Sequence, residues 1–145
     1  MKKQYIVLAL LIITAILGIA FYNNTQIPNE SRKINTFLSS IKEGEKFDLS
    51  RECEICDSVY IIKPYDTAFF AHHHEIKASS KVKDHLISLV SSNDGMCLLL
   101  FLKDCKVTAY AEIPRTTADF ANIYQNGFNV NTSLFIDKNK KVNIK

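Results

Sequence analysis

The pattern of hydrophobic and polar residues divides the chain into one long apolar run and a mixed remainder. The run, Tyr5–Tyr22, holds eighteen residues without a charge. As a helix rising 1.5 Å per residue it would reach roughly 27 Å, close to the ~30 Å hydrocarbon thickness of a bilayer. A buried helix of a globular protein normally carries a polar stripe, which this run lacks. The pattern therefore predicts a membrane-spanning helix in contact with the lipid bilayer.

The residues that flank the run predict its orientation. Lys2 and Lys3 precede it, and residues 23–30 contain no Lys or Arg, so the positive-inside rule places the N-terminus in the cytoplasm. A signal peptide cleaved after Ala20 is the alternative. Because the apolar run continues for two aromatic residues beyond Ala20, we favour the uncleaved anchor. The expected location is a bacterial inner membrane, single-pass, with the following domain in the periplasm.

The remainder of the chain predicts one domain. Residues 1–22 form the expected anchor and 23–29 a polar linker, and 30–145 are enough for a single hydrophobic core. Lys2 and Lys3 supply two charges of the formal net charge of +3. The domain is therefore nearly neutral, which excludes nucleic acid as its partner, because such partners require a strongly basic face.

Hydrophobic periodicity predicts the elements of that domain. Apolar residues at helical spacing indicate helices over Glu30–Glu43 and 80–92, and a third helix opens at Thr116 and ends at Gly127. β-branched, aromatic or continuously apolar runs indicate five strands, which are Ser58–Lys63, Cys97–Leu102, Val107–Ile113, 133–137 and 142–144.

The order of these elements predicts an α+β fold. We expect a mixed, mostly antiparallel sheet of about five strands with about three helices. If helix 80–92 is a crossover, strands 58–63 and 97–102 lie parallel, with a right-handed connection.

All four cysteines lie in the domain, and an exported domain favours disulfides. Cys105 lies at the tip of a predicted hairpin, far from Cys97 at its open end, so these two are not expected to pair. With the two strands parallel, Cys56 and Cys97 both lie at strand starts. We therefore predict that Cys97 bonds to Cys56 or Cys53, with free thiols as the alternative.

The C-x-x-C spacing of Cys53 and Cys56 is also that of thiol redox sites. Such sites lie after a strand at a helix N-terminus, whose dipole lowers the pKa of the thiol. Here the motif precedes a strand, and Glu52, Glu54 and Asp57 surround it. Because negative charge raises a thiol pKa, redox catalysis is the weaker hypothesis.

A histidine run, His72-His73-His74, precedes Glu75 in an expected loop. His72 and His74 are the candidate metal ligands. The sequence does not match the spacing of a zinc finger, because no second histidine follows at three to five residues. We therefore expect a solvated polar loop, without a metal ion or another cofactor.

One block of the sequence suggests a family. Cys56-Asp57-Ser58-Val59-Tyr60-Ile61-Ile62-Lys63-Pro64-Tyr65, and the later Leu98–Arg115 hairpin followed by Asp119-Phe120, resemble small bacterial envelope proteins. Those proteins are lipoproteins or single-span anchored proteins of unknown function. The family pattern often has tryptophan at the position of Cys56. The resemblance covers about residues 56–121 and assigns no functional residue.

These observations predict a non-enzymatic domain that binds another protein of the envelope. Tyr65, His73 and Arg115 are the candidate residues of the interaction surface. A toxin-immunity protein is one concrete version of this hypothesis. The alternative is an exported thiol-redox or metal-dependent enzyme that uses the C-x-x-C motif or the histidines.

Overall fold

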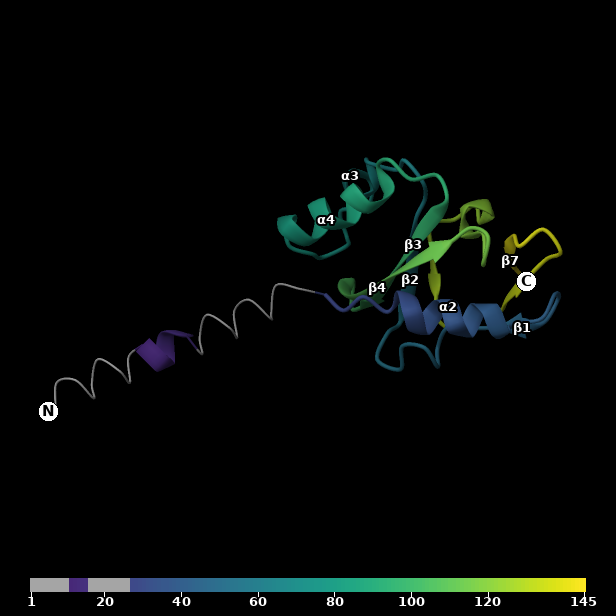
Figure 1. Ribbon diagram of the computed structural model, residues 1–145, viewed down its shortest axis with the longest axis horizontal. Coiled ribbons are helices and arrows are strands. Elements are labelled where there is room, and N and C mark those ends of the chain that lie inside the picture. Colours follow the sequence, from purple (N-terminus) through teal and green to yellow (C-terminus); the bar gives the residue numbers. More distant parts are fainter. Residues whose placement is uncertain (1–10, 16–26) are drawn as a thin grey trace, which may run out of the picture.

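The computed structural model describes residues 11–15 and 27–145 of the chain (Figure 1). Most of the predicted anchor Tyr5–Tyr22, and most of the predicted linker, lie outside the described residues. Within residues 11–15 and 27–145, no helix is both long and apolar enough to cross a membrane. The predicted single-pass location in a bacterial inner membrane is therefore not supported, and we correct it.

A four-stranded antiparallel sheet forms the centre of the fold. Its strands lie in the order β4-β3-β2-β5, and their bounds are Lys106–Pro114, Met96–Lys103, Ser58–Ile62 and Gly127–Asn129. A smaller sheet has the order β1-β6-β7, with bounds Lys46–Phe47, Leu134–Ile136 and Val142–Ile144. All strand pairs within the two sheets of the described chain are antiparallel.

The predicted single mixed sheet of about five strands is therefore wrong, and the described chain has seven strands in two sheets. Strands β2 and β3 run antiparallel, with Ser58 opposite Leu102 and Ile62 opposite Leu98. The direction of β3 follows from the place where the segment connecting β2 to β3 ends. The Tyr65 N–H donates to the Val90 carbonyl, so the helix before β3 finishes beside the end of β2, and β3 must run back.

Helices cover the two faces of the central sheet (Figure 1). Helix α2 (Ser31–Ser40) and the smaller sheet pack on one face, around Leu99 and Phe101. Helices α3 (Phe69–His72) and α4 (Ser80–Val90) pack on the other, around Leu98 and Leu100. Strand β3 is thus buried on both faces, which explains its continuous apolar sequence.

The helix predicted from Thr116 to Gly127 is wrong. Only a 3-10 turn, η1 (Phe120–Asn122), forms there, and Gly127 begins strand β5. Backbone hydrogen bonds to distant segments replace the helical ones. The Asp119 N–H donates to the Lys140 carbonyl, and the Asn126 carbonyl accepts from the Ile61 N–H.

The helices predicted over Glu30–Glu43 and 80–92 are confirmed as α2 and α4. The strands predicted over 58–63, 97–102, 107–113 and the C-terminal hairpin are also confirmed.

Candidate functional site

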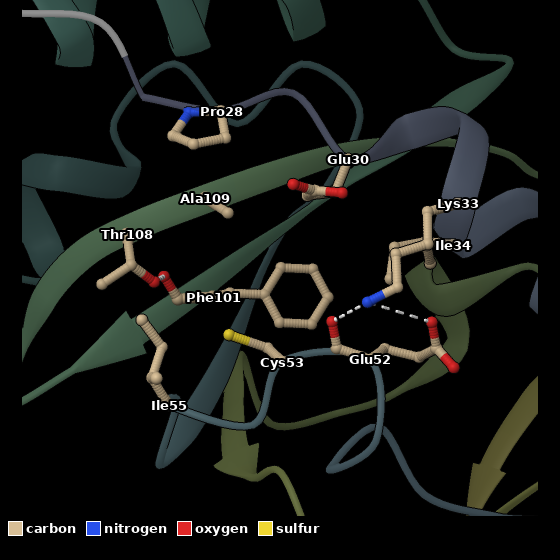
Figure 2. Close-up of a pocket in the computed structure, with 10 residues that line it drawn as sticks. All are labelled: Pro28, Glu30, Lys33, Ile34, Glu52, Cys53, Ile55, Phe101, Thr108 and Ala109. Atoms are coloured by element: carbon tan, nitrogen blue, oxygen red, sulfur yellow. Dashed lines mark hydrogen bonds and ion pairs between the residues drawn. The ribbon is translucent and has the colours of Figure 1, made fainter.

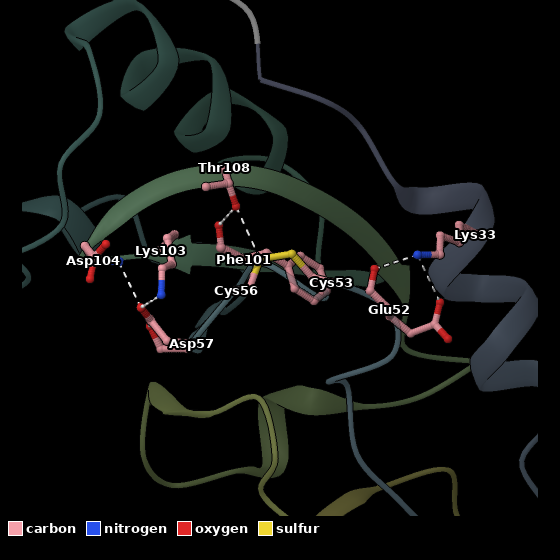
Figure 3. The surroundings of a disulfide bond; sticks show 10 residues. Lys33, Glu52, Cys53, Cys56, Asp57, Phe101, Lys103, Asp104 and Thr108 are labelled. Atoms are coloured by element: carbon pink, nitrogen blue, oxygen red, sulfur yellow. Dashed lines mark hydrogen bonds and ion pairs between the residues drawn. A yellow bond between two sulfur atoms is a disulfide. The ribbon is translucent and has the colours of Figure 1, made fainter.

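A disulfide joins Cys53 to Cys56 at the entrance to strand β2 (Figure 3). The Cα atoms of the two residues are 5.4 Å apart. The Cys56 N–H donates to the Cys53 carbonyl over 3.1 Å, and the Glu52 N–H donates to Leu49 over 3.1 Å. Two successive turns, anchored by the fully buried Leu49, therefore hold the C-x-x-C motif in place.

Cys97 is not the partner that the sequence predicted. It is the second residue of strand β3, lies opposite Ile113 and carries a free, buried thiol. Cys56 lies at the other end of β3, where the Asp57 N–H donates to Leu102. The distance along β3 from Cys97 to Leu102, next to Cys56, is five residues, on the order of 16 Å. Burial raises the pKa of the Cys97 thiol to about 11, so this thiol is inert near neutral pH.

A cavity of about 180 Å³ opens beside the disulfide (Figure 2). Ile34, Phe101 and Ala109 form apolar parts of its wall, and the Cys53 side chain completes it. Cys53 is half-buried, whereas Cys56 is 8% exposed and lies outside the set of lining residues. The two sulfur atoms are therefore not equivalent, because only Cys53 faces the cavity.

Thr108 links the cavity to Cys56. Strand β4 contains a β-bulge at this residue, since Ala109 pairs with Phe101 but Val107 pairs with Leu102. The extra residue places Val107 and Ala109 on opposite faces of the sheet. The Thr108 hydroxyl donates to the Phe101 carbonyl over 2.9 Å and lies 3.3 Å from Cys56 Sγ (Figure 3).

Most of the negative charge around the motif is engaged. The Lys33 ammonium contacts the Glu52 carboxylate at 3.6 Å and donates to the Glu52 carbonyl. Asp57 accepts from the Asp104 N–H and contacts Lys103. The Asp104 N–H and the Ser58 hydroxyl, aided by the Lys103 charge, hold the pKa of Asp57 below its usual value. The acidic neighbours that argued against a redox site are thus partly compensated.

The histidine run is dispersed. His73 packs against the rings of Phe69 and Tyr60, with centroids 4.6 and 5.4 Å away, and its Nδ1 lies 3.1 Å from Glu75 Oε1. The Glu75 N–H and the His73 ring lower the pKa of the Glu75 carboxyl. His72 ends α3 and His74 lies in a different cavity, and both are exposed. Among the described residues, no group of three or more potential ligands could hold a metal ion.

The other candidate interaction residues lie away from the disulfide. Tyr65 follows β2, has a left-handed backbone (φ 61°) and is 57% exposed. Arg115 follows β4 and binds both carboxylate oxygens of Asp119 at 2.9 Å. Both residues lie at the end of the sheet opposite to the C-x-x-C motif, since Cys56 precedes β2. Arg115 therefore has a structural partner, and His73 has its own contacts with Phe69 and Tyr60.

Sequence reasoning missed Thr108 and Lys33 at this site. Neither belongs to a motif, and a bulge leaves no signal in the alternation of a strand.

Comparisons with protein-family models, with curated proteins and with solved structures found no match to this chain. What the resemblance to small envelope proteins implies therefore stays a prediction.

Proposed function

We propose that this protein performs thiol–disulfide exchange, with Cys53 as the attacked sulfur and Cys56 as the leaving and resolving cysteine. The observation that carries the proposal is the asymmetry of the pair. Cys53 lines a cavity, and Cys56 lies behind it beside Thr108. Exchange requires access to one sulfur, and shielding of the other limits side reactions.

A purely stabilising role explains the disulfide less well. The bond closes a loop of four residues, for which the chain-entropy relation gives only about 2 kcal/mol. The bond joins two positions of one turn that backbone hydrogen bonds already fix. Structural disulfides gain most when they connect distant segments, and this one does not.

The exchange proceeds in two balanced steps. A substrate thiolate attacks Cys53 Sγ, the Cys53–Cys56 bond breaks, and a mixed disulfide forms while Cys56 leaves as a thiolate. A second substrate thiolate then attacks the substrate sulfur of the mixed disulfide and releases Cys53 as a thiolate. The substrate dithiol loses two electrons and becomes a disulfide, and the protein gains them as a dithiol. The reverse sequence reduces a substrate disulfide.

Among the neighbouring residues, Thr108 supports these steps. The charges of the cavity wall do not, because Lys33 is paired with Glu52 and Glu30 also lines the cavity. The Thr108 proton is directed to the Phe101 carbonyl, so the Thr108 oxygen can accept from the Cys56 thiol once the disulfide is reduced. Thr108 is therefore a positioning residue that stabilises the reduced form.

The test uses the full chain with C97A and C105S, which leaves only the motif cysteines. Equilibration with glutathione buffers, followed by alkylation and mass measurement, gives the reduction potential. We expect a value between about −120 and −270 mV, the range of exchange proteins, and a value below about −300 mV would mark a structural disulfide and overturn the proposal. T108V should make the potential more negative, whereas T132V, a matched control elsewhere, should not.

A second measurement addresses the roles of the two cysteines. In the same background, C56A leaves Cys53 as the single thiol and C53A leaves Cys56. Reaction with an aromatic disulfide should be about tenfold or more faster at Cys53, because accessibility controls attack. Equal rates would refute the assigned roles.

The prediction of a non-enzymatic binding domain, including its toxin-immunity version, stays a prediction.

A further inference from the structure

A second cavity, of about 500 Å³, lies at the N-terminus of helix α4. Four of its lining residues carry basic side chains, and none carries a carboxylate. The basic residues are His74, Lys77, Lys83 and Lys106. Ile76 and Val82 beside them belong to the apolar cluster on the α4 face of the central sheet, whereas Phe101 and Ala109 of the thiol cavity belong to the other face. The two cavities are thus separate.

The fold fixes these cations from three different segments. Lys77 and Lys106 are neighbours in a parallel β-bridge. The Lys77 N–H donates to the Cys105 carbonyl over 2.7 Å, and the Val107 N–H donates to the Lys77 carbonyl over 3.1 Å. Lys83 belongs to α4, and its ammonium lies 5.3 Å from the Phe70 ring centroid. The backbone positions of the lysines are therefore set by the fold, independently of any ligand.

The lysines of this cavity are not neutralised by ion pairs within the described chain. No carboxylate forms an ion pair with Lys77, Lys83 or Lys106 in the part of the protein that the structure describes. The first turn of α4 contains no acidic residue, although the positive end of a helix dipole favours one. Several like charges around one depression raise the local potential and attract anions.

We propose that this cavity binds a small ligand bearing phosphate groups. Three ammonium groups and an imidazole suit a dense, multiply charged anion better than a single carboxylate. The depression is shallow and open to solvent, and its volume exceeds what one monatomic ion needs. The site lies on the opposite face of the sheet from Cys53, so it is independent of the thiol function.

The test titrates pyrophosphate into the full chain at constant ionic strength and follows the heat of binding. We expect saturable binding, weakened about tenfold or more in K77Q/K106Q, because each lysine provides a charge-assisted contact. The matched control, K138Q/K140Q, removes the same charge from an exposed turn and should bind like the unmodified chain. Absent binding, or equal loss in both variants, would overturn the proposal.

A phospholipid headgroup carries the same chemistry, and a vesicle assay distinguishes this source. Co-sedimentation with phosphatidic acid vesicles, lost in K77Q/K106Q and displaced by pyrophosphate, would support the site and identify lipid as the source of the phosphate. Pyrophosphate binding without vesicle binding would support a soluble ligand. Thermal unfolding of both variants without ligand serves as the folding control, since Lys77 and Lys106 are exposed.

Discussion

At the scale of single residues, Asp119 has two structural roles. Its carboxylate accepts from the Ala121 N–H at the start of η1 and forms a bidentate ion pair with Arg115. Burial alone would raise the pKa of Asp119, but the hydrogen bonds from Arg115 and Ala121 and the Arg115 charge hold it below its usual value. The side chain is only 13% exposed, so solvent screens this pair weakly.

We expect D119N to lower the free energy of unfolding by about 1–3 kcal/mol at pH 7, because it removes a charge-assisted pair from Arg115. The folded-state pKa of Asp119 is depressed, so its contribution is present above the unfolded value near 4 and is lost as the pH falls through the folded value. Urea unfolding at pH 7 and pH 3 should show the difference shrink. D84N, an exposed control on α4, should change stability little, and a pH-independent loss in D119N would contradict the account.

At the scale of elements, the β3–β4 hairpin depends on an unusual turn. Asp104 and Cys105 form its two-residue loop, and both have left-handed backbones, with φ of 49° and 63°. Such loops favour Asn-Gly, because only glycine adopts this conformation without steric cost. The hairpin forms because β3 and β4 pair along eight positions, which compensates for the turn.

We expect C105G to raise the free energy of unfolding by about 0.5–1 kcal/mol, because it relieves the left-handed strain at that position. The carbonyl of residue 105, which accepts from Lys77, is retained. C105A is the matched control, since it removes the thiol but keeps the Cβ. Urea unfolding should separate the two variants, and equal stabilisation by both would assign the effect to the thiol and not to the backbone.

At the scale of the whole molecule, the central sheet separates two apolar clusters. Leu98 and Leu99 are adjacent in β3, both fully buried, and point into different clusters. Alternation along a strand sends neighbouring side chains to opposite faces. Because β3 and β4 contribute to both clusters, the two faces share their central strands and should unfold together.

We expect L98A and L99A each to lower the free energy of unfolding by about 2–5 kcal/mol, the range for buried leucines. Each variant should still unfold in one transition, because both clusters depend on the same strands. Circular dichroism follows the whole backbone, and tyrosine fluorescence includes the signals of Tyr60 and Tyr110, which pack on the α4 face. An earlier tyrosine transition in L98A alone would show that the faces are separate units.

Local patterns were sufficient for elements whose buried face repeats regularly. Helix α4 shows this, with its buried Val82, Leu86 and Val90, and so does the continuous run of β3. The capping interaction at the start of α4, in which the Ser79 hydroxyl accepts from the Val82 N–H, also joins residues that are close in sequence. Such features depend on neighbouring residues, which the sequence contains directly.

The candidate site could be predicted only in part. The C-x-x-C spacing identified Cys53 and Cys56, but the choice of Cys97 as a partner followed from a wrong strand direction. Strand direction depends on where the connecting segment ends in space, here beside Val90. The cavity, the Thr108 bulge and the basic site at α4 each combine residues that are distant in sequence.

The sequence by itself therefore determined helices α2 and α4, most strands and the spacing of the cysteines, since those depend on local periodicity. The tertiary structure decided the antiparallel order of the sheet, the short η1 turn in place of a third helix, and the pairing of Cys53 with Cys56. The physical reason is that backbone hydrogen bonds and burial between distant segments outweigh local preferences wherever the two compete.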